Sequence, residues 1–370
     1  MWNLIKKELL HILRDRGLLI FVIYAFSLDI FLAAKGFQLI PEHVSIAAYD
    51  EDHSVESREL LSRIREPAFS KPRIIKDRAE IDRIMNNSEA ILILDIPNGF
   101  ERDIHREGTT VQVLVDGSQS TAAYLSSAYL GKIINDFSLE KTIEENYRKG
   151  LRFEVPVELR SRILFNPDAR DDIYEGLIEF FMMITLVGMI LPAAMLIRER
   201  EYGTIEQILI SPLSIGRLII LKILASMLFL ISVIAASYLL VLKLWLGLPL
   251  KGGITDFLVV TLIFLISTTG LAFIIASVAR RFSQIGMLTI VIFAPMLLLS
   301  GGWVPPEALP DWLRAATRVS PLKQFMDIGV SILIRGATMD MLSLKLAKLF
   351  IIGAALIGTG GLLYKRKVLK

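Results

Sequence analysis

The chain lacks the residues on which several classes of protein depend. Its 370 residues include no cysteine, which excludes disulfides, thiolate metal sites and a cysteine nucleophile. The four histidines are scattered, and no nucleophile–base pair is visible in the sequence. The acidic run from Asp50 to His53 carries cation-binding groups, but exposed acidic turns are a far commoner origin of such a run. We therefore expect no catalytic residue and no metal site.

The chain also has a low net charge and lacks a nucleotide-binding motif. The formal net charge is only +3, which gives no reason to expect a nucleic-acid partner. The sequence contains no G-x-x-x-x-G-K-[ST] motif, the glycine-rich loop that cradles nucleotide phosphates. If ATP drives this protein, the nucleotide must therefore bind to a partner subunit.

Long apolar segments are what the chain has in abundance. Hydrophobic residues make up 53% of the sequence, and they gather in blocks of about 20, the length that crosses a bilayer core of about 30 Å. The first block is longer than a signal-peptide core of roughly 7–15 residues, so we interpret it as an uncleaved anchor. Ala354 and Gly358 in the last block predict a close helix contact. The predicted transmembrane helices are 17–39, 174–197, 217–245, 256–279, 283–300 and 344–364.

The cations of the short connecting segments predict the orientation. They gather at the N-terminus, in 198–217, at Arg280 and Arg281, and at the C-terminus, whereas the segment between the third and fourth spans offers mainly Lys251. The positive-inside rule therefore places both termini in the cytoplasm. Residues 1–16 are predicted to form a cytoplasmic amphipathic helix, either in the membrane interface or as a plain positive flank.

Residues 40–172 differ from the rest because they are polar and alternate in pattern. Strands followed by helices indicate a compact α/β domain, and the segment is long enough to bury a small core. With the termini inside, this domain is extracytoplasmic, between the first span and a five-helix region at 173–370. The fold class is thus an α-helical membrane protein with six spans and an inserted α/β domain. The predicted strands are 44–50, 73–75, 90–96 and 110–118, and the predicted helices are 54–65, 77–86 and 119–147.

A dense charge cluster and a short capped segment join the second and third spans. Thr204 and Gln207 have the spacing of a capping box, and Pro212 ends the helix that they start. An isolated helix of about two turns is marginal in water, so its apolar face needs a surface to pack on. That surface is either the membrane or another protein, and we favour docking on a partner over a plain polar hairpin. Within 198–216, the residues concerned are Arg198, Glu199, Arg200, Glu201, Gly203, Thr204, Ile205, Glu206, Gln207, Ile208 and Leu209.

The segment 301–342, predicted to lie at the outer face, combines glycine, proline and aromatic residues. Asp311 and Ser320 are placed to cap two short helices, with Pro321 at the first position of the second. Its apolar content favours a re-entrant or interfacial segment over a plain surface loop, and its glycines let the chain turn there. The candidate exit residues are Gly301, Gly302, Trp303, Pro305, Pro306 and Trp312.

Three carboxylates fall inside or near the edge of predicted spans. Asp29 lies within the first span, and Glu175 and Glu179 lie four residues apart on one face of the second. Charged groups in spans are costly and usually face a cavity or a partner, so these can line a pathway for cationic substrates. The alternatives are interfacial snorkelling and an ordinary ion pair of Asp29 with a basic neighbour.

The segment from Arg198 to Pro212 resembles the cytoplasmic coupling segment of ABC-2 type exporter permeases. The usual pattern of that family is close to RERE-x-GT-x-E-x-L-x-x-[ST]-P, and this chain departs from it in having Ile208 and Leu209 around the expected leucine. The Pro-rich piece 305–312 and the long insert with DGSQS at 116–120 are also similar to the long-insert branch of the family. That branch is often linked to drug or ion export.

The resemblance implies the permease subunit of an ATP-driven exporter in the plasma (inner) membrane. A separate ABC ATPase subunit binds ATP and Mg²⁺ in that family, so Glu199, Arg200 and Glu201 are expected to contact it and residues 204–209 to dock on it. The permease is expected to pair with a second permease, as a homodimer or with a sister subunit. The expected substrate is amphipathic or hydrophobic, drug-like or lipid-like. No cofactor is expected on this chain.

Other functions are less well supported. A membrane sensor would recognise ligands with the outer domain, but it needs a cytoplasmic output domain that this sequence does not contain. An ATP-independent transporter needs no ATPase partner, and inverted repeats typical of secondary transporters are not evident. An enzyme acting on lipid-linked substrates needs clustered acids or a metal motif at one membrane face, and neither is visible.

Overall fold

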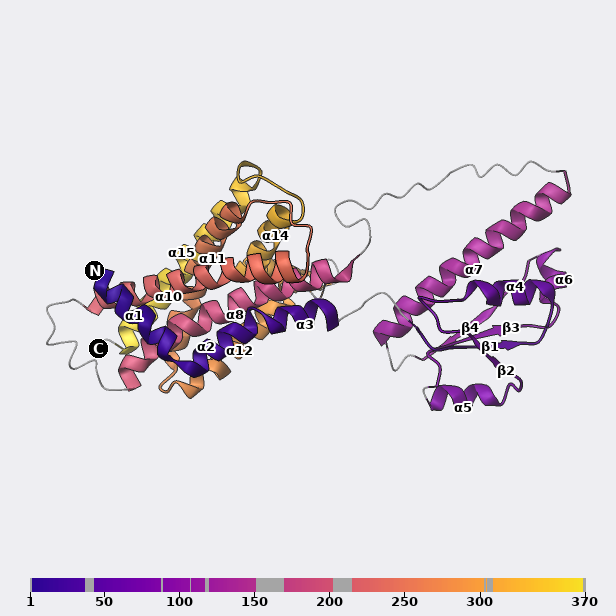
Figure 1. The fold of residues 1–370 in the computed structure, drawn as a ribbon, viewed down its shortest axis with the longest axis horizontal. Coiled ribbons are helices and arrows are strands. Elements are labelled where there is room, and N and C mark those ends of the chain that lie inside the picture. The colour runs from indigo at the N-terminus through magenta and orange to yellow at the C-terminus, as the bar shows by residue number, and fades with distance from the viewer. Residues whose placement is uncertain are drawn as a thin grey trace. The chain divides into compact units, whose positions relative to one another are not determined.

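The chain divides into two compact units, which we call the helical unit (Met1–Phe37 with Ile163–Lys370) and the α/β unit (Gln38–Arg162). Figure 1 shows the helices of the first unit and the sheet of the second. The computed structural model describes residues 2–36, 43–87, 89–106, 108–116, 120–150, 170–201, 215–302, 304 and 309–368.

Five helices of the helical unit are long and apolar enough to cross a membrane, and they coincide with five of the six predicted spans. The sixth predicted span, 283–300, coincides with α12 (Ser283–Leu298), whose 16 residues are fewer than the roughly 20 of a typical crossing. Its passage through the membrane stays a prediction. The five are Arg16–Gly36, Asp171–Arg198, Ile215–Trp245, Ile254–Val278 and Asp340–Lys367.

The first span is interrupted near its middle, which its composition did not predict. It consists of α2 (Arg16–Ala25) and α3 (Leu28–Gly36), with the break at Phe26 and Ser27. Ser237 Oγ of α10 (Ile215–Ser237) donates a hydrogen bond of 2.6 Å to the Phe26 carbonyl. A neighbouring hydroxyl thus satisfies a carbonyl at the break, as an irregular backbone in a membrane requires. Beyond Ser237 the helix continues as the π-helix η2 (Tyr238–Trp245).

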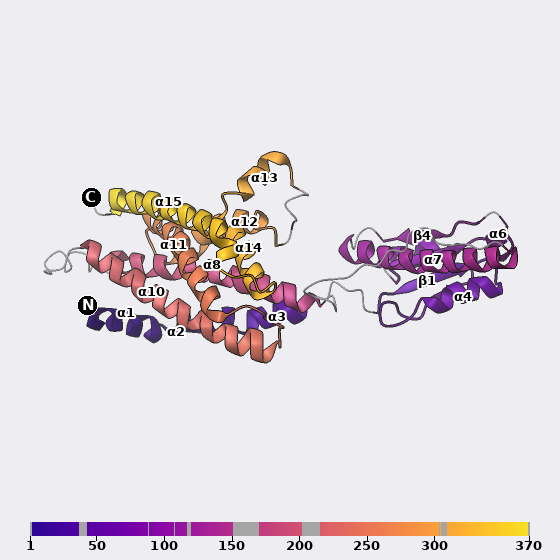
Figure 2. The same ribbon diagram turned by 90° about the horizontal axis from the view of Figure 1, so that it is seen from above.

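Helix α8 (Asp171–Glu201) is the centre of the helical unit. The apolar window of its span is 89% buried, against 17% for α15 (Ser343–Val368). Figure 2 shows α8 between α10 and α3 on one side and α12 and α14 on the other. Because α8 touches most of the other helices, a shift of α8 must move or repack them.

Helices α11 (Ile254–Val278) and α15 pack closely through glycines. A Cβ atom at Gly270 would overlap the backbone of α15, and one at Gly360 would overlap the Gly270 carbonyl. Ala354 and Gly358, the pair predicted to allow a close helix contact, are exposed on another face of α15, so their contact stays a prediction. Gly353 and Gly360, two turns apart, face α11 instead.

The segment after α12 contains α13 (Asp311–Thr317), α14 (Pro321–Leu333) and the short η4 (Asp340–Leu342). The Ser320 cap is confirmed, since its side chain accepts a hydrogen bond from the Lys323 amide. The Asp311 cap was wrong, because Pro310 occupies the cap position and Asp311 faces Arg314 at 3.4 Å. Helix α14 is largely buried, and Phe325 stacks on Phe264 of α11 with ring centroids 4.1 Å apart.

The α/β unit holds a four-stranded sheet in the order β2-β1-β3-β4, with β4 antiparallel to β3 and the other pairs parallel. The strands are β1 (Ile46–Asp50), β2 (Arg73–Ile75), β3 (Leu92–Ile96) and β4 (Gln112–Val115). The crossovers β1–β2 and β2–β3 run in opposite directions across the sheet. Right-handed crossovers therefore place their helices on opposite faces.

A separate hydrophobic core lies on each face of the sheet. Helices α4 (Val55–Arg63) and α7 (Ser120–Arg148) cover one face, and α5 (Glu80–Asn86) covers the other (Figure 1). Each predicted strand and helix of this region overlaps an observed element, while the short α6 (Phe100–Ile104) was not expected.

The acidic turn after β1 has a structural role. The Asp52 carboxylate accepts hydrogen bonds from the Gly99 and Glu101 amides, at 2.7 and 2.9 Å, and so holds the start of α6. Asp50 accepts a hydrogen bond of 2.7 Å from Ser57 Oγ, which ties the end of β1 to α4. The Asp50 and Asp52 carboxylates therefore hold the end of β1 and the starts of α4 and α6 together by hydrogen bonds.

One buried cation links α7 to α4. The Lys141 Nζ lies 2.7 Å from a Glu56 oxygen and 2.6 Å from a Glu59 oxygen, and its side chain is almost wholly buried. Removal of one partner of a buried ion pair leaves an uncompensated charge, which costs more than the intact pair contributes.

We expect Lys141→Met to lower the free energy of unfolding of the α/β unit by about 3 kcal/mol, because it leaves Glu56 and Glu59 without their ammonium group. Hydrogen exchange of β1 and β3 in the full chain at increasing urea concentration measures this. The matched control is Lys149→Met, whose ion pair with Glu145 is exposed and is expected to contribute little. Equal losses in the two variants would contradict the prediction.

The same contact predicts that the stability of the α/β unit falls at acidic pH. Hydrogen bonds from Lys141 and Arg63 hold the pKa of Glu59 below its usual range. Because the folded pKa is the lower one, this stabilisation is present above the unfolded pKa, about 4.3, and is lost as the pH falls through the folded pKa. We expect the urea midpoint of the α/β unit to fall between pH 5 and pH 3. The fall should be smaller in Glu59→Gln, and an equal fall would refute this assignment.

Candidate functional site

The candidate site is the end of the helical unit where α8 ends and α10 begins. The segment between them, 202–214, contains most of the predicted coupling residues and lies outside the described residues. The described ends of both helices are held by side chains that we call the junction. It comprises Glu8, Asp15, Arg198, Glu201, Lys222 and Phe282.

Arg198 ties the end of α8 to the start of the first span. Its guanidinium forms an ion pair with Asp15, and its central carbon lies 5.1 Å from the centroid of the Phe282 ring. Asp15 is also the N-cap of α2, because its side chain accepts a hydrogen bond of 3.1 Å from the Leu18 amide. One carboxylate therefore serves both as a helix cap and as the partner of a predicted coupling residue.

Glu201 ties the same end of α8 to the turn between α11 and α12. Its carboxylate accepts a hydrogen bond of 3.1 Å from the Phe282 amide. That amide belongs to the residue before α12, where helix N–H groups have no partner within the helix. Glu201 thus satisfies a backbone donor of its own chain. Glu199 and Arg200 lie in the same last turn of α8.

Lys222 ties the start of α10 to α1 (Trp2–Arg14). Its Nζ lies 2.8 Å from a Glu8 oxygen, and Lys222 and Glu8 are only 5% and 8% exposed. Both charges have left water, so their geometry has to compensate for a desolvation cost of several kcal/mol per ion. Such a pair fixes the register of α1 against α10 more than it raises overall stability.

The junction makes the N-terminal segment a bridge between the two helices that flank 202–214. Glu8 on α1 holds α10, and Asp15 just after α1 holds α8. Sequence analysis did not find these partners. Lys222 inside an apolar span was the available signal, because a charge there requires a partner.

A second cluster brings two of the three predicted pathway carboxylates together. Asp29 of α3 lies close to Glu179 of α8 and to Tyr24. Glu175 lies one turn away on α8.

Lys35, the basic residue of the first span, does not pair with Asp29 among the described contacts. The Lys35 amine lies 2.8 Å from an Asp172 oxygen, at the end of α3 and the start of α8. This ion pair joins α3 to α8 at the end of the helical unit opposite to the junction. Asp29 is left to face Tyr24 and Glu179.

The predicted exit residues are described in part. Gly301 adopts a left-handed φ of 80°, which is the expected glycine break after α12. The Gly302 carbonyl accepts a hydrogen bond of 3.1 Å from the Tyr174 hydroxyl, and its position against Ile178 and Met326 has little room for a side chain. Trp312 is 73% exposed. Trp303, Pro305 and Pro306 lie outside the described residues.

Comparison with known proteins gives a family and several relatives. The model of the "ABC-2 family transporter protein" family matches residues 17–362. The chain is 29% identical over 368 residues to the "Inner membrane transport permease YhhJ" of Escherichia coli K12, covering 99% of this chain and 97% of that protein. It is also 29% identical over 373 residues to the "Probable multidrug ABC transporter permease YbhR" of the same organism, covering 100% and 99%. A third E. coli K12 protein, the "Probable multidrug ABC transporter permease YbhS", is 25% identical over 360 residues, covering 96% and 93%.

We expect Lys222→Met to lower the apparent melting temperature of the purified chain by several degrees, because it leaves the Glu8 carboxylate buried without its ammonium group, at a cost of about 3–5 kcal/mol. Differential scanning fluorimetry in detergent measures this. The double variant Glu8→Leu with Lys222→Met is expected to recover most of the loss, since it removes both charges.

Lys243→Met is the matched control, because Lys243 lies at the exposed end of the same continuous helix. If the double variant is no more stable than the single one, the Glu8–Lys222 contact does not hold α1 to α10.

Proposed function

The chain belongs to the ABC-2 family of transporter proteins, and from this membership we propose that it is the permease subunit of an ATP-driven exporter. It is a multi-pass membrane protein in which a separate ATPase docks on the segment 198–216. ATP and Mg²⁺ bind to that partner. The single observation that carries the proposal is the junction, because it links both helices that flank this segment to the rest of the helical unit.

The docking proposal divides the coupling residues into two groups. Arg198 and Glu201 contact their own chain, through Asp15 and the Phe282 amide, and so position the end of α8. Glu199, Arg200 and residues 203–209 face the ATPase, with the helix capped at Thr204 as the docked element. Movement of the ATPase then reaches α8 and α10 together, because α1 and α2 connect them.

The topology proposal places the junction in the cytoplasm and the α/β unit outside, in the inner membrane. The N-terminal helix and the C-terminal end of α15 lie at the same end of the helical unit (Figure 2), which supports an even number of crossings. Five long spans and α12 make six. The described part of α3 ends, and that of α8 begins, at the Lys35–Asp172 ion pair, at the end of the helical unit opposite to the junction.

The proposed substrate is an amphipathic or hydrophobic molecule, drug-like or lipid-like. Support comes from the relatives that are named as probable multidrug permeases. The neighbouring carboxyl groups of Asp29 and Glu179 in a largely apolar unit suit substrates that carry a positive charge. A second permease, either another copy or a sister subunit, completes the pathway, and Gly301, Gly302 and Trp312 belong to its exit.

We expect this chain to co-purify with its ABC ATPase, and Ile208→Glu and Gly203→Pro to lower the recovered ATPase at least tenfold. Ile208→Glu puts a charge on the proposed docking face, and Gly203→Pro rigidifies the segment before it. Val319→Glu is the matched control, because Val319 is an exposed apolar residue outside the segment.

ATP-dependent uptake of a lipophilic cationic dye into inverted membrane vesicles tests the direction and the cargo. The wild type should accumulate dye only with ATP and an active ATPase. Binding and uptake that persist in Ile208→Glu would exclude docking through this helix. Uptake that needs no ATPase would instead favour an ATP-independent transporter.

A further inference from the structure

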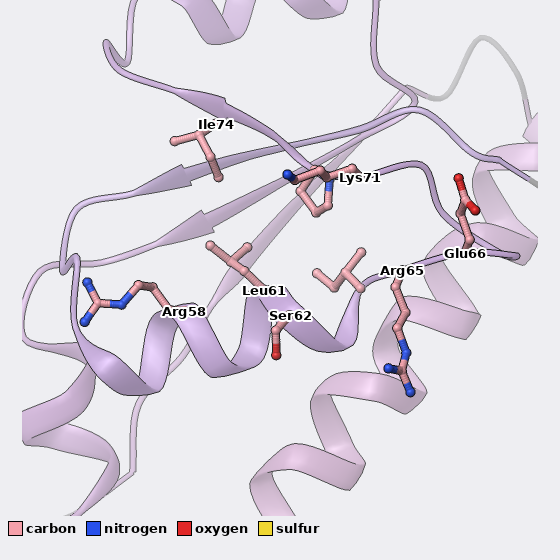
Figure 3. A pocket seen from close by; sticks show the side chains of 9 residues that line it. Arg58, Leu61, Ser62, Arg65, Glu66, Lys71 and Ile74 are labelled. Carbon is pink, nitrogen blue, oxygen red and sulfur yellow. The ribbon is translucent and has the colours of Figure 1, made fainter.

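A groove of about 530 Å³ lies on the α4 side of the sheet, beside its edge strand β2. This volume falls in the range of roughly 300–1,000 Å³ that is typical of sites for drug-sized ligands. Six of the residues that line it are Arg58, Leu61, Ile64, Arg65, Lys71 and Ile74. Figure 3 shows α4 on one side of this space and the strands on the other.

The groove exists because α4 does not cover the edge strand. The inward residues of α4, Leu60 and Ile64, pack with α7 and β3 in one core. On β2, Ile75 points to the opposite face and is buried beside α5. Side chains alternate along a strand, so Ile74 points to the α4 side, where it is 52% exposed. An apolar floor is thus left open at the edge of the sheet.

Cations surround this floor. Arg58, Arg65 and Lys71 line the groove, and among the described residues none of them forms an ion pair with a carboxylate. Arg63 and Arg73, their neighbours in sequence, do form ion pairs, with Glu59 and Glu89. A single carboxylate lines the groove, Glu66, and the His43 imidazole lies 3.9 Å from one of its oxygens.

The side chains nearest the floor have different roles. In Figure 3, Leu61 points from α4 toward the strands, while Lys71 and Arg58 lie on either side of it and Arg65 extends away from the strands. Arg58 also donates a hydrogen bond of 3.2 Å to the His53 carbonyl, which anchors its guanidinium at one end of the groove. The remaining guanidinium N–H groups can donate to an anion in the forked geometry that arginine offers.

We propose that this groove binds a soluble organic anion with an apolar body, such as an aromatic or aliphatic carboxylate or sulfonate. The apolar body lies on Leu61 and Ile74, the anionic group is bound by Arg58 through charge-assisted hydrogen bonds, and Lys71 adds positive charge on the other side of Leu61. The site is confined to the α/β unit, so it does not depend on the proposed ATPase partner.

The test uses the full chain in nanodiscs of zwitterionic lipid and two probes with the same aromatic body. These are 8-anilinonaphthalene-1-sulfonate, which is anionic, and N-phenyl-1-naphthylamine, which is not. We expect the sulfonate to slow hydrogen exchange of peptides covering 58–75, with a saturable dose dependence, and the uncharged probe to have no such effect at equal membrane partitioning.

The variants are charge-matched. The double variant Arg58→Gln with Lys71→Gln should raise the half-saturating sulfonate concentration at least fivefold. Its hydrogen exchange without any probe should match that of the wild type. Lys132→Gln with Arg148→Gln removes two exposed cations of α7 and should leave binding unchanged. The proposal is overturned if both probes protect 58–75 equally, if neither does, or if the two double variants lose binding to the same extent.

Discussion

The ion pair between Glu8 and Lys222 is the contact on which the junction depends. Two charges that have lost their water are tolerated only in contact with each other, so α1 has one register against α10. The chain then passes through Asp15, which caps α2 and binds Arg198 at the end of α8. Two spans that are adjacent in sequence are therefore joined through a third segment. Rotation of α10 alone would separate Lys222 from Glu8, and rotation of α8 alone would separate Arg198 from Asp15.

The rest of the helical unit is held by shape more than by charge. Between apolar helices in lipid the hydrophobic effect is weak, so close packing and hydrogen bonds have to supply the stability. Gly270 and Gly360 bring α11 and α15 into backbone contact. Phe325 of α14 stacks on Phe264 and meets Phe181 edge-on, so this short helix is packed among the spans rather than spread over a surface. These contacts leave α8 enclosed and α15 mostly uncovered.

Sequence predicted the features that depend on local pattern. The apolar runs predicted the lengths of the spans, and the alternation of strands and helices predicted the α/β unit. A serine directly before a proline predicted the helix cap at Ser320. The features that depend on tertiary packing were missed. Helical spacing alone could not decide whether Gly358 or Gly360 faces α11, because both lie in an apolar run. The break at Phe26 depends on a hydroxyl 211 residues away, which no local pattern reveals.

The candidate site divides in the same way. Arg198 and Glu201 were identified by their place in a charge cluster, but their partners Asp15 and Phe282 come from two other parts of the chain. Asp29 and Glu179 were each marked by a charge in a span, and only the fold brings them together. A polar residue in an apolar segment thus shows that a partner exists, while its identity requires the packed structure.

The separation of Glu8 and Lys222 in sequence has a consequence for how the protein is made. Glu8 leaves the ribosome 214 residues before its partner, which at typical synthesis rates is a delay on the order of ten seconds or more. During that interval α1 has no buried position to occupy, and its amphipathic face has to be sheltered by lipid or by the insertion machinery. The N-terminal helix is thus synthesised first and locked in place late. The N-terminal helix can pair with Lys222 only after α10 has been synthesised and has come to lie beside it.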